Sequence, residues 1–150
     1  MEGFVGDIKS KGRIEFLNIL LKNFTADDEK VRMQAIKLMS LLLSDPAIHE
    51  IVFKISDLQF LVGDIDELAS YPQLYTEEQE LLLYVLRIFG EFSRTPRISE
   101  LNLTNGILPT CVRISFDENN KYMKESRIWS LAVINRTCLH AIGDINIKAM

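Results

Sequence analysis

Residues 126–142, SRIWSLAVINRTCLHAI, bring together side chains that could do chemistry. They include the thiol of Cys138, the imidazole of His140, two serines and an asparagine. A thiolate activated by a nearby histidine is a common nucleophile in enzymes. In a helix, however, residues two positions apart point about 200° apart around the axis, so Cys138 and His140 cannot form a pair. The other histidine, His49, belongs to a different predicted helix, and we therefore predict no catalytic dyad.

Metal and phosphate sites are not indicated either. The chain has two histidines and two cysteines, without C-x-x-C or H-x-x-x-H spacing. The acidic run at 63–67, GDIDE, lacks the ligand spacing of a calcium loop, and the glycines are too scattered for a phosphate loop. We predict a protein that is not an enzyme and that uses no metal or cofactor.

The composition is that of a globular protein, and 150 residues predict a single domain spanning 1–150. The net charge of −4 gives no reason to expect nucleic acid or an anionic membrane as a partner. No apolar run approaches the roughly 18 residues of a membrane span, and no secretory signal is visible. We expect a cytoplasmic location, with the nucleus as the alternative. Cys111 and Cys138 lie among apolar neighbours, and we predict that both are buried, reduced thiols.

The spacing of apolar residues predicts helices throughout and no strand. The expected helices span residues 12–23, 27–45, 47–54, 57–70, 76–94, 97–104, 107–116 and 121–142. Thr25 is the expected N-cap of the second helix, and Thr76 with Gln79 forms a capping box by spacing. Asn105-Gly106 predicts a turn. Gly143 is expected to end the last helix, leaving residues 144–150 frayed.

The chain shows an internal repeat. Shifted by 50 residues, AIKLMSLLLSDPAIHEI falls on VLRIFGEFSRTPRISEL, with Pro46 on Pro96; a further shift of 45 places Tyr84 on Trp129. Units of long helix, short helix and helix are therefore expected at 25–75, 76–117 and, incomplete, at 118–142. Such units bury their apolar faces only by stacking on one another.

This organisation resembles the armadillo and HEAT repeat family. ISELNLTNGILPTCVRI looks like a second-to-third helix junction, and ESRIWSLAVI like the start of a third helix. The resemblance implies an all-α fold: a short right-handed superhelix of about two and a half repeats behind an N-terminal helix. It also implies that the long third helices line a groove that binds a partner protein.

In the importin-like branch of that family, a tryptophan and an asparagine four positions later hold extended peptides. The tryptophan positions correspond to Gln34, Tyr84 and Trp129, and the asparagine positions to Leu38, Ile88 and Val133. Because no asparagine is present, we do not expect nuclear-import cargo. The expected groove keeps an apolar floor, with charge supplied by Lys30, Glu80, Glu125 and Arg136.

Two residues have alternative interpretations. Trp129 is either core or a groove anchor, since tryptophan is frequent at binding hot spots. Asn135 lies within an apolar arc of its helix, and its amide is either hydrogen-bonded to the adjacent unit or exposed on a face that awaits a partner. The predicted function is a non-enzymatic protein-binding scaffold or adaptor. The alternative is a self-associating or heteromeric assembly subunit, or a fragment of a longer solenoid, that uses its exposed apolar end.

Overall fold

The protein is all-helical. The structure, a computed structural model, describes residues 2–55 and 58–149, and it describes side chains for residues 11–55 and 58–143. The described chain consists of helices joined by short loops, without a strand. In chain order the elements are α1 (Glu2–Lys22), η1 (Asn23–Thr25), α2 (Glu29–Leu42), η2 (Pro46–Ile48), α3 (His49–Ile55), α4 (Phe60–Ser70), α5 (Thr76–Phe92), α6 (Pro96–Ser99), η3 (Glu100–Leu103), α7 (Ile107–Ser115) and α8 (Lys124–Ala149).

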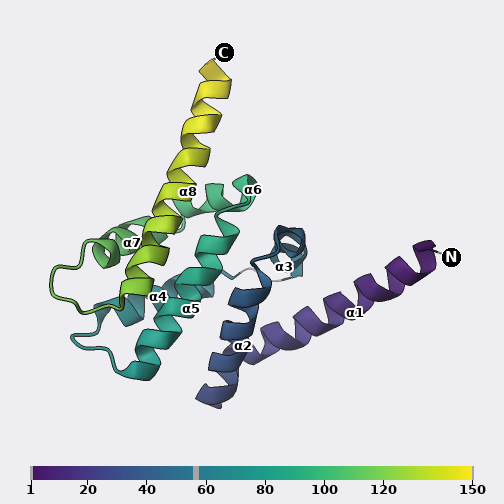
Figure 1. Ribbon diagram of the computed structural model, residues 1–150, viewed down its shortest axis with the longest axis horizontal. Helices are drawn as coiled ribbons and strands as arrows, with labels where there is room; N and C mark the ends of the chain where they lie inside the picture. The colour runs from purple at the N-terminus through teal and green to yellow at the C-terminus, as the bar shows by residue number, and fades with distance from the viewer. Residues whose placement is uncertain (1, 56–57, 150) are drawn as a thin grey trace.

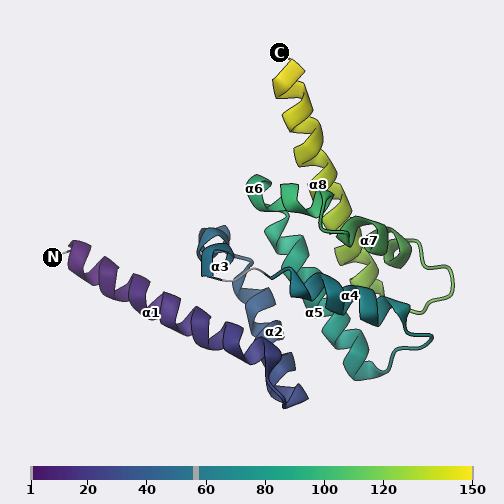
Figure 2. The same ribbon diagram turned by 180° about the vertical axis from the view of Figure 1, so that it is seen from behind.

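Three long helices form one layer of the molecule. Helix α2 packs against α5, and α5 packs against α8, so the three lie side by side (Figure 1). Helices α4 and α7 form a second layer, visible from behind in Figure 2, in which α4 contacts α5 and α7, and α7 contacts α8. The N-terminal α1 extends away from this body, and the C-terminal part of α8 projects beyond the helices on which α8 packs.

Local side-chain chemistry sets most helix boundaries, although two predicted caps are wrong. Helix α2 is capped by Asp28, whose carboxylate accepts the Lys30 N–H at 2.9 Å, and not by Thr25, which ends η1. A carboxylate at this position also suits the positive end of the helix dipole. In the same way Asp45 accepts the Ala47 N–H at 3.0 Å and starts η2 at Pro46.

The predicted capping box of α5 is wrong by one residue. The N-cap is Tyr75, whose N–H donates to the Glu78 carboxylate at 3.0 Å. Gln79 instead reaches the segment before α8: its amide donates to the Lys121 carbonyl at 2.6 Å and accepts the Met123 N–H at 3.2 Å. A hydrogen bond across 42 residues could not be read from local spacing.

The turn before α7 is confirmed. Gly106 has φ +86°, in the left-handed region that glycine adopts without strain, and Asn105 accepts the Ile107 N–H at 3.0 Å. Pro109 lies in the first turn of α7, where its missing N–H has no helical partner to lose.

Both predicted ends of α8 are corrected. The helix starts at Lys124 because the preceding loop is held in another conformation: Asp117 accepts the backbone N–H groups of Asn119 and Tyr122, and Asn120 has φ +53°. Gly143 does not end the helix, which continues to Ala149. A glycine within a helix costs about 1 kcal/mol relative to alanine, which neighbouring helix formers can outweigh. The predicted start of α4 at Asp57 lies outside the described residues.

The hydrophobic core lies between the two helical layers. It runs as one cluster from α1 to α8 and includes completely buried residues of α2, α4, α5 and α7. The largest of these side chains are Leu17, Phe24, Ile36, Met39, Leu43, Leu61, Ile65, Leu82, Leu86, Ile88, Ile107 and Ile114. Among the described helices, none has the length and apolarity needed to cross a membrane.

Candidate functional site

An acidic groove lies where the N-terminal ends of α2 and α5 meet the C-terminal half of α4. Its volume is about 820 Å³. Seven carboxylates and two cations line it, together with apolar and aromatic side chains. The lining residues are Asp28, Glu29, Lys30, Arg32, Met33, Gln34, Asp64, Glu67, Leu68, Tyr71, Glu77, Glu78, Glu80 and Leu81. The first-turn carboxylates of α2 and α5 each suit a helix dipole, and the packing of the two helices gathers them on one concave surface.

One of the two groove cations, Arg32, is already paired with a carboxylate of the protein itself. The Arg32 guanidinium donates to the Asp64 carboxylate at 2.6 Å and to the Phe24 carbonyl at 2.8 Å. Burial raises the pKa of Asp64, and the nearby Glu67 adds to this rise, although the charge and hydrogen bond of Arg32 oppose it. Arg32 is therefore a structural cation, and Lys30 is left as the exposed positive charge among the remaining carboxylates.

The predicted groove residues separate into several places. Gln34 and Glu80 line the acidic groove. Leu38 on α2 and Glu125 at the start of α8 are exposed elsewhere. Ile88 and Val133 are both 0% exposed and belong to the core, so no partner can touch them. This corrects their assignment to the groove floor. The residue four positions after Tyr84 or Trp129 points into the core and not toward the surface.

Trp129 is a wedge between α5 and α8. A Cβ atom on Gly90 would lie only 2.5 Å from the Trp129 Cε3 atom, so the indole occupies the space that glycine leaves. The guanidinium groups of Arg87 and Arg136 lie 5.3 and 5.8 Å from the centre of the ring, within the range of cation–π attraction. The ring remains partly exposed, so Trp129 combines the two interpretations of the sequence: it packs in the helix interface and contributes to the surface.

Tyr84 occupies the related position between α2 and α5. Lys37 lies 5.6 Å from the centre of its ring, as Arg87 lies over Trp129. The aromatic residues of α5 and α8 thus each face a cation from the long helix before them. Because Tyr84 and Trp129 both take part in packing, alanine at these two positions would change stability as well as any surface contact.

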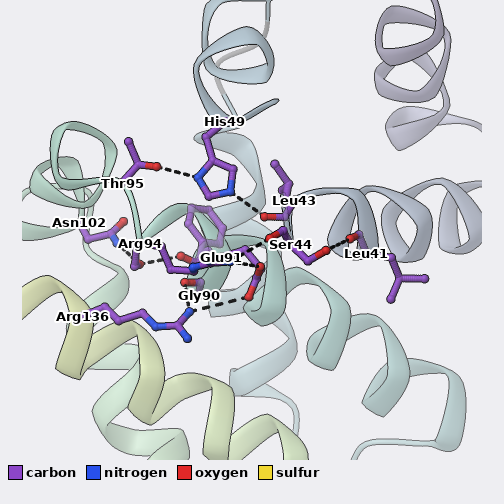
Figure 3. A network of polar contacts seen from close by, with 12 residues as sticks. Leu41, Leu43, Ser44, His49, Gly90, Glu91, Arg94, Thr95, Asn102 and Arg136 are labelled. Carbon is purple, nitrogen blue, oxygen red and sulfur yellow. Dashed lines mark hydrogen bonds and ion pairs between the residues drawn. The ribbon is translucent and has the colours of Figure 1, made fainter. Parts of the chain in front are cut away.

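A buried polar network joins the C-terminal ends of α2 and α5 to the middle of α8 (Figure 3). His49 is completely buried; its Nε2 donates to the Leu43 carbonyl at 2.6 Å, and its Nδ1 lies 2.7 Å from the Thr95 hydroxyl. Its ring also meets Phe92 edge to face at 5.5 Å. Asn102 donates to the hydroxyls of Ser93 and Thr137. Both nitrogens of His49 are therefore used within the fold, and no thiol is among their partners.

Glu91 is the buried charge of this network. Its carboxylate lies 3.3 Å from Arg94 and 3.8 Å from Arg136 (Figure 3). Each arginine also donates to a backbone carbonyl, Arg94 to Ser44 at 2.9 Å and Arg136 to Gly90 at 2.6 Å. Arg136, predicted to supply charge to a groove, instead links α8 to α5. Its charge also stabilises the buried Glu91 carboxylate.

The two cysteines differ in accessibility. Cys111 is buried, as predicted; burial raises the pKa of its thiol to about 12, although a hydrogen bond with Ser130 opposes the rise. Cys138 is exposed, which corrects the prediction of two buried thiols. Among the described residues, no group of three or more histidine, cysteine or acidic side chains is arranged to hold a metal ion.

A thiol reagent should distinguish these cysteines. At pH 8 a thiol with a pKa of about 12 is ionised in only about one molecule in ten thousand, and Cys111 is also shielded from the reagent. We expect one fast-reacting thiol in the native protein and a second one only after denaturation. Intact-mass measurement counts the modified thiols in each case. Cys138→Ser should abolish the fast phase, whereas Cys111→Ser should leave it unchanged. A fast phase that survives Cys138→Ser would contradict the assignment.

Helix α8 buries its hydroxyl face and exposes its apolar face. Ser126, Ser130 and Thr137 point inward with Val133, and their small side chains let α8 approach α5 and α7 closely. The opposite face carries large apolar side chains that remain about half exposed. These are Ile128 (52%), Leu131 (47%), Leu139 (58%) and Ile142 (54%). We name this set, with the exposed Asn135 at its centre, the α8 strip.

The two interpretations of Asn135 are thereby separated. Its side chain is exposed and makes no hydrogen bond to the described part of the chain, so the arc around it is not covered by an adjacent unit. Amphipathicity identified the two faces of the helix but could not assign the apolar one to the core. The hydroxyl-bearing face of α8 is the one that packs inward, because close packing on α5 favours small side chains.

Comparisons with protein-family models, with curated proteins and with solved structures give no match to this chain.

Proposed function

We propose that the protein is a non-enzymatic interaction scaffold of armadillo/HEAT-like helical repeats, and that its acidic groove binds a basic segment of a partner protein. The groove itself carries this proposal. Its lining has seven carboxylates and two cations, whereas the net charge of the whole chain is only −4, so the acidity is concentrated at this surface. Tyr71, Met33 and Leu81 add apolar area among the carboxylates. Such a surface suits a peptide with lysines or arginines between apolar residues.

Several features support the repeat architecture. The order of long helix, short helix and second-layer helix occurs twice, as α2, α3 and α4 and as α5, α6 and α7, and α8 adds a third long helix. The contacts α2–α5, α5–α8 and α4–α7 are those of stacked units. The cations at Lys37 and Arg87, which are 50 residues apart like Pro46 and Pro96, face equivalent aromatic rings. The right-handed superhelix and the cytoplasmic location remain part of the proposal.

A titration with designed peptides tests the groove. The probe is a synthetic peptide of alternating lysine, arginine and leucine, and its matched control carries glutamate in place of each basic residue. We expect binding of the basic peptide only, weakening as salt rises from about 50 to about 200 mM because ions screen the charges. The triple variant Glu29→Gln, Glu77→Gln, Glu80→Gln should bind at least about tenfold more weakly.

Charge outside the groove provides the control. Glu15→Gln, Glu100→Gln and Glu118→Gln remove the same charge from exposed positions that do not line the groove, and this variant should retain most of the affinity. If both triple variants lose affinity equally, general charge attraction explains the binding and the groove does not. Lack of any binding by the basic peptide would also refute the proposal.

A second function, assembly through α8, is favoured by a different observation. The α8 strip places four large, half-exposed apolar side chains on one face, and such a face commonly marks a protein interface. A helix covered on two sides by α5 and α7 and open on this third side has room for another helix. We propose that the strip joins the protein to another subunit.

A further inference from the structure

We infer that the α8 strip binds the α8 strip of a second copy of this chain, antiparallel, with Asn135 of each copy on the two-fold axis. The inference rests on the assembly function proposed above and names its partner. The spacing of the strip is symmetric. Ile128, Leu131, Asn135, Leu139 and Ile142 lie symmetrically about Asn135, at seven and four residues on either side.

This spacing is complementary to itself. A two-fold axis through Asn135 places Ile128 opposite Ile142 of the second copy and Leu131 opposite Leu139. Interfaces with two-fold symmetry require such a match, because the same patch serves both subunits. The successive steps of the strip are three, four, four and three residues, which keep these side chains on one face of the helix, as in the apolar seams by which helices pair.

Asn135 identifies the partner most specifically. A polar side chain in the middle of an apolar seam is costly to bury unless its hydrogen bonds are satisfied. The carboxamide carries both a donor and an acceptor, so the same amide from a second copy satisfies it. A single asparagine in a helical seam is a known device for fixing register and the number of strands. An apolar partner surface would leave the amide unpaired.

Charge determines the direction of the pair. Between Ile128 and Ile142 the strip carries no charged residue, and the exposed Lys124 lies one turn before it on the same face. A parallel pair would bring the two Lys124 side chains together. In the antiparallel pair, Lys124 of one copy lies level with a position 22 residues beyond Lys124 of the other copy. At the rise of an α-helix the two lysines are then about 33 Å apart along the axis, and they do not repel each other.

The area of the strip determines the strength of the pair. From Ile128 to Ile142 it is about 21 Å long, on a helix about 10 Å across. This offers less than the roughly 800 Å² that each partner contributes to a standard stable interface. We therefore expect a weak dimer, half-formed on the order of 100 µM, and monomer at low concentration.

Sedimentation of the full chain tests the association. The wild type should change from monomer to dimer between about 1 µM and about 1 mM. Leu131→Asp with Leu139→Asp should remove the dimer without loss of helicity, since both side chains are exposed in the monomer. Asn135→Leu should tighten association about tenfold, because it removes the polar group from the seam. A wild type that stays monomeric throughout would overturn the inference.

Thiol cross-linking tests the geometry, in a Cys138→Ser background with Cys111 left buried. Asn135→Cys should oxidise to a covalent dimer, and Glu118→Cys, in an exposed loop, should not. Ile128→Cys and Ile142→Cys should each cross-link poorly alone but readily when mixed. Cross-linking of Ile128→Cys alone would indicate a parallel pair and overturn the inference. If Asn135→Cys forms no covalent dimer but association still depends on Leu131, the two-fold pairing is overturned. The proposed assembly function would then stand with a different partner surface.

Discussion

Replacing Gly90 by valine is expected to lower the free energy of unfolding by about 3 kcal/mol, because overpacking a filled site outweighs the gain in helix propensity. A Cβ atom at this position would lie 2.5 and 2.9 Å from two carbons of the Trp129 ring. The indole has little room to retreat, since Arg87 and Arg136 lie against it. For a chain of this size the midpoint of thermal unfolding should fall by roughly 6 to 12 °C.

Two variants make this prediction specific. Gly63 is also helical, and an added Cβ there meets nothing within 4 Å, so Gly63→Val should leave stability nearly unchanged. Trp129→Leu should destabilise the protein by itself but remove most of the additional penalty of Gly90→Val. Strict additivity of the two changes in a double-mutant cycle would show that Gly90 and Trp129 are not coupled.

Replacing His49 by alanine is expected to cost about 3 kcal/mol of unfolding free energy. The change removes a completely buried ring, its edge-to-face contact with Phe92, and the hydrogen bonds to Leu43 and Thr95. The Leu43 carbonyl would then be left without its donor in the interior, which adds a desolvation penalty. Denaturant unfolding of the variant and the wild type measures the loss.

The hydrogen-bond partner supplies the comparison. Thr95→Val should cost only about 1 kcal/mol, since it removes one hydrogen bond and keeps the side-chain volume. Lys54→Ala, at an exposed position of the same short helix, should have almost no effect. Equal losses for His49→Ala and Lys54→Ala would mean that the network does not hold α3 to α5.

The helical class was predictable because it depends on local information. The apolar spacing of α2 and α5, the breaks before Pro46 and Pro96, and the Asn105-Gly106 turn all act within a few residues. The boundaries that failed depend on distant contacts. Gln79 is not available for a capping box because it bonds to Lys121 and Met123, more than forty residues away.

The candidate site was only partly predictable. The sequence predicts Gln34 at a groove position from the repeat register and Glu80 as a charge near it, and both line the acidic groove. The contribution of α4 through Asp64, Glu67 and Tyr71 was missed, because it depends on how a second-layer helix meets two long helices. The superhelical arrangement itself stays a prediction.

The inward hydroxyl face of α8 has a consequence for local unfolding. Val133 is a completely buried apolar residue on this face, beside the buried Ser130 and beside Ser126, whose buried hydroxyl makes no hydrogen bond within the described part of the chain. Fewer apolar side chains are fully buried on α8 than on α5, so the amides of α8 should exchange with solvent through openings of lower free energy than those of α5. Covering the outer strip would slow that exchange, so the rigidity of the last helix should depend on protein concentration.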